Sequence, residues 1–139
     1  MIIIDFEGEP LKPLSERRAK LSPMRDVAGM IRSFDYAAGI VEREGQLAAA
    51  GRGHLRAHSL LREFRQVAET AFLAGYAEGR AAPLTEKERH LIRAFAIEKA
   101  AYEIVYEAAN RPDWIDIPLR GLAVLVNGLG VRRERADAE

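Results

Sequence analysis

The sequence contains no cysteine, which excludes disulfide bonds, thiolate chemistry and zinc sites built on cysteine. A chain without cysteine fits the reducing cytoplasm, and we expect a cytoplasmic protein. Neither sign of charge is in excess, because 21 basic residues balance 21 acidic ones, so we expect no nucleic-acid partner. No apolar run approaches the roughly 20 residues of a membrane-spanning helix, and the N-terminus lacks the regions of a signal peptide. We therefore expect no membrane partner either.

Strand-forming sequence is also scarce, and residues 2–6 are the only good candidate. Three consecutive isoleucines, Ile2 to Ile4, are stiff at χ1 and favour an extended backbone. An unbroken apolar run indicates burial on both faces, which one strand cannot achieve without neighbouring strands. Because the remaining chain offers almost none, we expect a mainly α fold with one isolated N-terminal strand.

Helical periodicity accounts for most of the remaining chain. Ser22 and Pro23 have the residue types of a helix start, while Thr85 and Glu88 match a capping box. The Asn110–Asp113 stretch, which contains a proline, predicts the end of the helix that begins near Thr85. The expected helices span 22–45, 54–79, 85–110 and 118–130, with a loop over 8–21 and a flexible turn over 45–53. The apolar stripe expected on the third helix comprises Leu91, Ala94, Ile97, Ala101, Ile104, Val105 and Ala108.

The sharpest local motif follows the expected strand. Asp5 ends the apolar run, and Glu7 and Gly8 follow it. Carboxylate oxygens are the ligands that Mg²⁺ prefers, and strand alternation places Asp5 and Glu7 on the same side. The motif therefore predicts a magnesium site at Asp5, with Glu7 assisting. The alternative is an ordinary charged turn, since short acidic turns are common.

Two separate blocks of sequence resemble the C-terminal lobe of maltokinases, which are sugar kinases often fused to trehalose synthase. The first block comprises Asp5–Pro10, Ser22–Met30 and Arg32–Tyr36. The second comprises Glu98–Glu103, Tyr106–Glu107, Asn110–Trp114 and Ile117–Gly121. The blocks occur in the family's order and at about its spacing, whereas residues 39–88 match only in helical character.

The resemblance implies an aminoglycoside-phosphotransferase-like, protein-kinase-related fold that transfers the γ-phosphoryl group of ATP to maltose, giving maltose 1-phosphate. It places Asp5 at the family's magnesium-binding aspartate. The family's His-Gly-Asp-type catalytic loop and its N-terminal lobe have no counterpart here, so we expect no catalytic residue in this chain. By the resemblance, we expect the partner of the isolated strand to belong to the family's N-terminal lobe. We expect one partial domain, 1–139, made of a strand and metal loop (1–21), a helical bundle (22–131) and a frayed tail (132–139).

A second candidate site lies on the predicted third helix. Lys99, Tyr102 and Tyr106 share one helical face, and the resemblance matches them to the family's contacts with the acceptor sugar. Tyrosine suits such a site because its ring packs on a sugar's C–H face while its hydroxyl bonds oxygens. Glu103 and Arg120 are weaker candidates. The alternative is that the tyrosines lie at the edge of the core, with their rings packed against it and their hydroxyls exposed to solvent.

Two functions remain open on this basis. The first is a fragment of maltokinase, inactive alone, whose partners are maltose or a related glucoside, ATP, Mg²⁺ and the missing lobe or a fused trehalose synthase. The second is a helical interaction module derived from the kinase, which forms a homodimer through the edge of residues 2–4. Either would allow a dimer, because the missing lobe exposes apolar surface.

Overall fold

The computed structural model describes residues 11–48 and 53–136, and in these ranges every regular element is a helix. The expected mainly α fold is therefore confirmed, while the expected strand over residues 2–6 lies outside the described residues. The elements are α1 (Leu14–Arg17), α2 (Met24–Ala48), α3 (Gly53–Gly79), α4 (Glu86–Asn110), the 3₁₀ turn η1 (Pro112–Trp114) and α5 (Asp116–Ala136).

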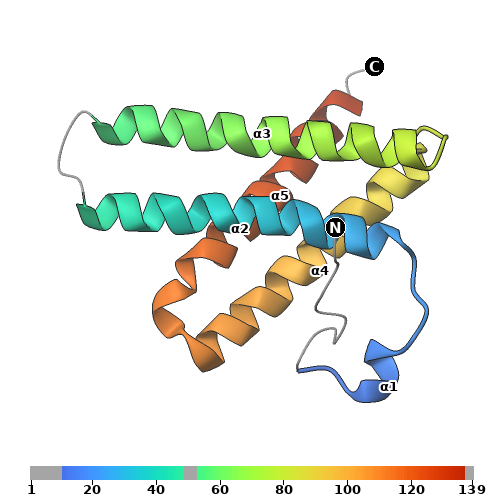
Figure 1. Ribbon diagram of the computed structural model, residues 1–139, viewed down its shortest axis with the longest axis horizontal. Helices are drawn as coiled ribbons and strands as arrows, with labels where there is room; N and C mark the ends of the chain where they lie inside the picture. The colour runs from blue at the N-terminus through green and yellow to red at the C-terminus, as the bar shows by residue number, and fades with distance from the viewer. Residues whose placement is uncertain (1–10, 49–52, 137–139) are drawn as a thin grey trace.

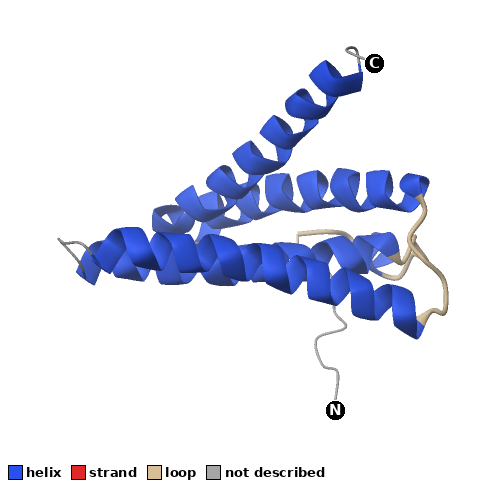
Figure 2. Ribbon diagram, turned by 90° about the horizontal axis from the view of Figure 1, so that it is seen from above, coloured by secondary structure: helices blue, strands red, loops and turns tan. Residues whose placement is uncertain are grey.

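The helices α2 and α3 run antiparallel and side by side (Figure 1). The α4 helix crosses α2 obliquely on its other side, and α5 packs against both α4 and α2. Seen from above, α5 rises away from the other helices toward its C-terminal end (Figure 2). The helix α2 therefore lies at the centre, in contact with α3, α4 and α5.

Small residues let α2 and α4 approach closely. Ala28 and Ala100 are fully buried, and Ala96 is 2% exposed. Around them the core gathers larger apolar side chains, because removing apolar area from water is the main favourable term in folding. The core cluster comprises Met24, Val27, Ala28, Leu84, Ile92 and Ala96, with Phe72, Leu73, Tyr76, Phe95 and Leu125 packed against it.

The starts of α2 and α4 agree with the capping signals of the sequence. The backbone N–H of Met24 donates to Oγ of Ser22 at 3.3 Å, next to the start of α2. At the start of α4, Glu88 donates its backbone N–H to Oγ1 of Thr85 at 3.2 Å, and Glu88 Oε2 accepts from the backbone N–H of Thr85 at 2.8 Å. The predicted capping box is thus present, and α4 ends at Asn110 as expected.

Three expectations about the helices are wrong. The segment 8–21 contains the short helix α1, α2 continues past Gly45 to Ala48, and α5 begins at Asp116 and runs to Ala136. The apolar stripe expected on α4 is also not the buried face of this helix. Ala94, Ala101 and Ala108 are exposed, and Val105 is 60% exposed. The buried face contains Ile92, Ala96, Ala100 and Glu107, because α2 crosses α4 where small side chains and a paired carboxylate allow contact.

None of the helices described over 11–48 and 53–136 has the length and apolar character that crossing a lipid bilayer requires.

Candidate functional site

A hollow of about 470 Å³ opens between α2 and α4. We call it the tyrosine hollow because three tyrosines line it, Tyr36 from α2 and Tyr102 and Tyr106 from α4. Its remaining lining is Ser33, Ala37 and Ile40 of α2, Lys99, Glu103 and Glu107 of α4, and Arg111. Four of the five residues that the sequence nominates for sugar binding therefore face one hollow: Lys99, Tyr102, Glu103 and Tyr106.

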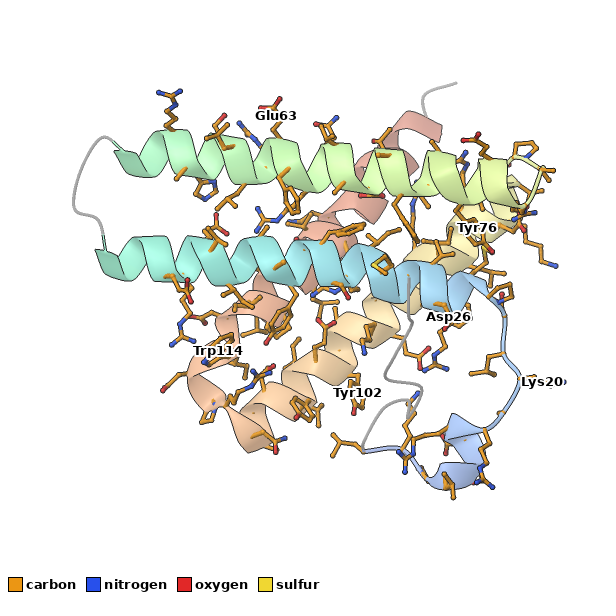
Figure 3. The ribbon with its side chains drawn as sticks, in the orientation of Figure 1. Lys20, Asp26, Glu63, Tyr76, Tyr102 and Trp114 are labelled. Carbon is orange, nitrogen blue, oxygen red and sulfur yellow. The ribbon has the colours of Figure 1, made fainter. Side chains whose placement is uncertain are left out.

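Two parallel aromatic rings form one wall of the tyrosine hollow. Tyr102 and Tyr106 stand one turn apart on α4, with ring centroids 6.4 Å apart and planes inclined by 20°. Each ring has a cation over it: Lys99 Nζ lies 5.4 Å from the Tyr102 centroid, and the guanidinium carbon of Arg111 lies 6.0 Å from the Tyr106 centroid. The α4 helix points Tyr102 toward the segment that precedes α2 (Figure 3).

The carboxylate of Glu103 is held from beneath by a buried arginine. Arg32 of α2 is only 2% exposed, and its Nη2 donates to Glu103 Oε2 at 2.6 Å. The other terminal nitrogen of Arg32 pairs with Asp35 on its own helix. Burial raises the pKa of Glu103, against the hydrogen bond from Arg32, which acts to lower it. The Arg32–Glu103 pair thus links α2 and α4 directly under the hollow.

A second carboxylate, that of Glu107, is compensated in a similar way. The hydroxyl of Tyr36 donates to Glu107 Oε1 at 2.5 Å, and Arg111 donates to both oxygens, at 2.9 Å from Nε and 2.6 Å from Nη2. Burial and the bond to Glu107 raise the pKa of the Tyr36 hydroxyl well above its ordinary value. Bidentate arginine pairing of this kind fixes geometry as well as charge.

Sequence reasoning did not nominate Arg32, Tyr36, Glu107 or Arg111, although all four lie in the maltokinase-like blocks. One signal was present, because Glu103, Glu107 and Arg111 follow one another at intervals of four residues and must share a helical face. The pairing with α2 had no such signal, since Arg32 and Glu103 are 71 residues apart.

The structure does not bring Arg120 to the tyrosine hollow. This side chain is exposed on α5 and faces a different hollow of about 750 Å³, which Asp35, Glu42 and Arg65 also line. The arrangement therefore separates Arg120 from the other four candidates. Its predicted sugar contact finds no geometric support in this part of the chain.

The two nominated metal ligands, Asp5 and Glu7, lie outside the described residues, so the magnesium site stays a prediction. Over residues 11–48 and 53–136, no group of three or more histidine, aspartate and glutamate side chains is arranged to hold a metal ion.

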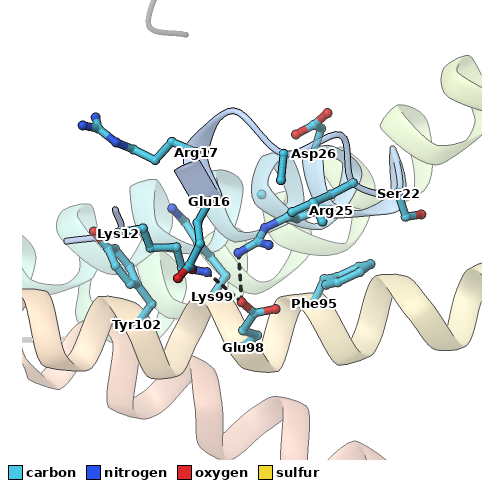
Figure 4. A pocket seen from close by; sticks show the side chains of 13 residues that line it. Lys12, Glu16, Arg17, Ser22, Arg25, Asp26, Phe95, Glu98, Lys99 and Tyr102 are labelled. Carbon is cyan, nitrogen blue, oxygen red and sulfur yellow. Dashed lines mark hydrogen bonds and ion pairs between the residues drawn. The ribbon is translucent and has the colours of Figure 1, made fainter. Parts of the chain in front are cut away.

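A neighbouring hollow of about 660 Å³ shares a wall with the tyrosine hollow, because Lys99 and Tyr102 line both (Figure 4). Its other side is formed by the segment 12–22, the first turns of α2, and Phe95 and Glu98 of α4. Lys12 and Arg25 both donate to Glu98 Oε1, at 3.0 and 2.9 Å. This neighbouring hollow is more strongly charged than the tyrosine hollow, since four basic and three acidic side chains line it.

Comparison with known proteins connects the chain to a sugar kinase. No protein-family model matches it. A glucosamine kinase of Mycolicibacterium smegmatis is 26% identical over 129 residues, which is 91% of this chain and 30% of the kinase. The chain therefore spans less than a third of the length of this curated relative. The similarity supports a relationship to sugar kinases but does not extend to maltokinase in particular.

Proposed function

We propose that the chain is the acceptor-binding part of the C-terminal lobe of an ATP-dependent sugar kinase, and that the tyrosine hollow receives the acceptor sugar. The observation that carries the proposal is the convergence of Lys99, Tyr102, Glu103 and Tyr106 on one hollow. The similarity to a glucosamine kinase, itself a sugar kinase, also supports it.

The side chains of the hollow suit a sugar chemically. The stacked rings of Tyr102 and Tyr106 offer a flat apolar wall for the C–H face of a pyranose. Lys99 is a donor for sugar hydroxyls, and Glu103 is an acceptor while it is ionised. The Arg32 guanidinium holds the Glu103 carboxylate in place, so the hollow is organised before a ligand arrives. In this proposal the chain's own task is to bind the acceptor and orient its reacting hydroxyl.

In this proposal the phosphoryl transfer itself would need parts of a sugar kinase beyond the region that this chain matches. ATP would supply the phosphoryl group, and Mg²⁺ would neutralise its developing charge. Asp5 and Glu7 have the oxygen ligands that such a cation prefers, and by resemblance they would hold it.

The charges of the hollow favour a neutral sugar, and we propose maltose over glucosamine. Both carboxylates of the lining are already compensated, Glu103 by Arg32 and Glu107 by Arg111. Lys99 adds a further positive charge over the Tyr102 ring. The ammonium group of glucosamine would therefore meet no uncompensated carboxylate here, whereas the hydroxyls of a neutral disaccharide need only hydrogen bonds.

Isothermal titration of the 139-residue chain with maltose, and separately with glucosamine, tests this proposal. We expect maltose to bind, and Tyr106→Ala to weaken its affinity by about tenfold or more through loss of the stacking wall. Arg120→Ala is the matched control and should leave the affinity unchanged, because Arg120 faces another hollow. Equal losses in the two variants would contradict the assignment of the site, and tighter binding of glucosamine would overturn the choice of sugar.

A further inference from the structure

The segment that precedes α2, residues 11–21, is fastened to α4 beside the tyrosine hollow; we call it the strap. The backbone N–H of Leu11 donates to the hydroxyl of Tyr102 at 3.2 Å. The next strap residue, Lys12, places its Nζ 3.0 Å from Glu98 Oε1. Glu98 and Tyr102 are one helical turn apart on α4. Two consecutive strap residues thus bind two consecutive turns of the helix.

Glu98 joins three parts of the molecule, as Figure 4 shows. Its Oε1 accepts from Lys12 of the strap and from Arg25 in the first turn of α2. The Arg25 guanidinium also lies 6.0 Å from the Phe95 ring centroid, one turn back along α4. The bond from Lys12 is the main cause that lowers the pKa of Glu98, and Arg25 lowers it further. Glu98 is therefore ionised at neutral pH and holds both cations.

The strap contacts the proposed sugar site at the Tyr102 hydroxyl. That oxygen accepts from Leu11, so the strap orients the ring that separates the two hollows. Lys99 lies over the same ring. Fixing Tyr102 therefore also fixes the surface on which Lys99 rests.

We propose that Glu98 is a positioning residue: it holds the strap on α4 so that Leu11 orients Tyr102 for the acceptor sugar. Its role in sugar binding rests on the proposed function, whereas the link from Glu98 through Leu11 to Tyr102 does not. No sequence signal nominated Glu98, which does not line the tyrosine hollow itself.

Amide hydrogen exchange at Leu11 in the 139-residue chain tests the link without any sugar. Glu98→Gln should speed the exchange of this amide by about fivefold, because the strap opens more often when its ion pairs are lost. Tyr102→Phe should do the same by removing the acceptor oxygen, and the double variant should add little. Glu63→Gln is the control, since Glu63 is exposed on α3 and points away from the other helices (Figure 3). Unchanged exchange in Glu98→Gln would overturn the inference.

Maltose titration of the same variants tests the consequence for the site. Glu98→Gln should weaken maltose binding severalfold in the unmodified background and leave it nearly unchanged in the Tyr102→Phe background. A merely structural role for Glu98 would give equal losses in both backgrounds and would overturn the positioning role. If maltose does not bind at all while Leu11 exchange still responds to Glu98→Gln, the proposed function and the sugar role of Glu98 fail together, and only the link from strap to Tyr102 survives.

Discussion

Among single residues, Arg32 is one of the two largest fully buried side chains of the described structure, with Pro118. It is 2% exposed, and its guanidinium lies against the backbone of α5 at Gly121. A β-carbon at Gly121 would lie 2.8 Å from Nη2 of Arg32 and would overlap its other terminal nitrogen. A buried arginine of this kind tolerates neither loss of its carboxylates nor added volume beside it.

We therefore predict that Gly121→Ala destabilises the chain by about 1–3 kcal/mol, because the methyl group overpacks the Arg32 site. Gly75→Ala is the matched control: it lies within α3 with open space around its β-carbon position, and should stabilise by about 0.5–1 kcal/mol. Urea unfolding followed by circular dichroism measures both. Similar effects from the two substitutions would show that the guanidinium moves aside easily.

A single backbone angle gives a second prediction at this scale. Ala81, in the turn between α3 and α4, has φ of 55°, a conformation that costs an L-residue roughly 1 kcal/mol. Ala81→Gly should therefore raise the free energy of unfolding by up to about 1 kcal/mol, whereas Ala101→Gly in the exposed middle of α4 should lower it by about that amount. If the thermal unfolding midpoints of Ala81→Gly and Ala101→Gly shift in the same direction, Ala81 is not strained.

At the scale of elements, α4 contains the best-defined start of a helix. Glu88 closes the capping box with Thr85 and also accepts from Arg80, the residue after α3, at 2.7 Å. Arg80 first, then the bonds from Thr85, lower the pKa of Glu88 from 4.5 to about 2. One carboxylate therefore both caps α4 and joins it to α3.

The lowered pKa sets the direction of a pH effect. Because the folded-state pKa lies below the unfolded value, the contribution of Glu88 to stability is complete above about pH 4.5 and is lost as the pH falls toward about 2. Glu88→Gln should therefore flatten the dependence of the urea midpoint on pH in this window. Glu78→Gln, an exposed change on α3, should leave that dependence as it is. An unaltered slope in Glu88→Gln would contradict the assignment.

Both ends of α4 could be predicted from the sequence because their signals are local. The capping box at Thr85 and the break at Pro112 each lie within a few residues of the boundary that they set. The buried face of α4 could not be predicted, because it depends on where α2 crosses, and that crossing selects Ala96 and Ala100 over larger neighbours. Four candidate sugar residues could be grouped in advance because they lie on one helix. The position of Arg120 could not be predicted, because it depends on how α5 packs against α4 and α2.

At the scale of the whole molecule, apolar side chains remain uncovered on α3. Leu60, Phe64 and Val67 follow one another at helical spacing and are 56%, 46% and 59% exposed. Rows of this kind bind hydrophobic dyes in water. We predict that Phe64→Glu lowers the fluorescence of bound anilinonaphthalene sulfonate by about half, whereas Ser59→Glu, which adds the same charge on the same helix, changes it little. Equal decreases of dye fluorescence in Phe64→Glu and Ser59→Glu would show that the added charge, and not the lost apolar side chain, causes the effect.

The position of α4 has a consequence for cooperativity. This one helix carries the capping box at Thr85, the ion pairs of Glu98 and much of the lining of the tyrosine hollow, and it packs against α2 and α5. Because α2 and α5 both pack against α4, loss of this helix would remove part of the core of the bundle, so we expect α4 to unfold together with it. Trp114, directly after α4, and the helices should then report the same unfolding, so tryptophan fluorescence and helical ellipticity should show one coincident transition.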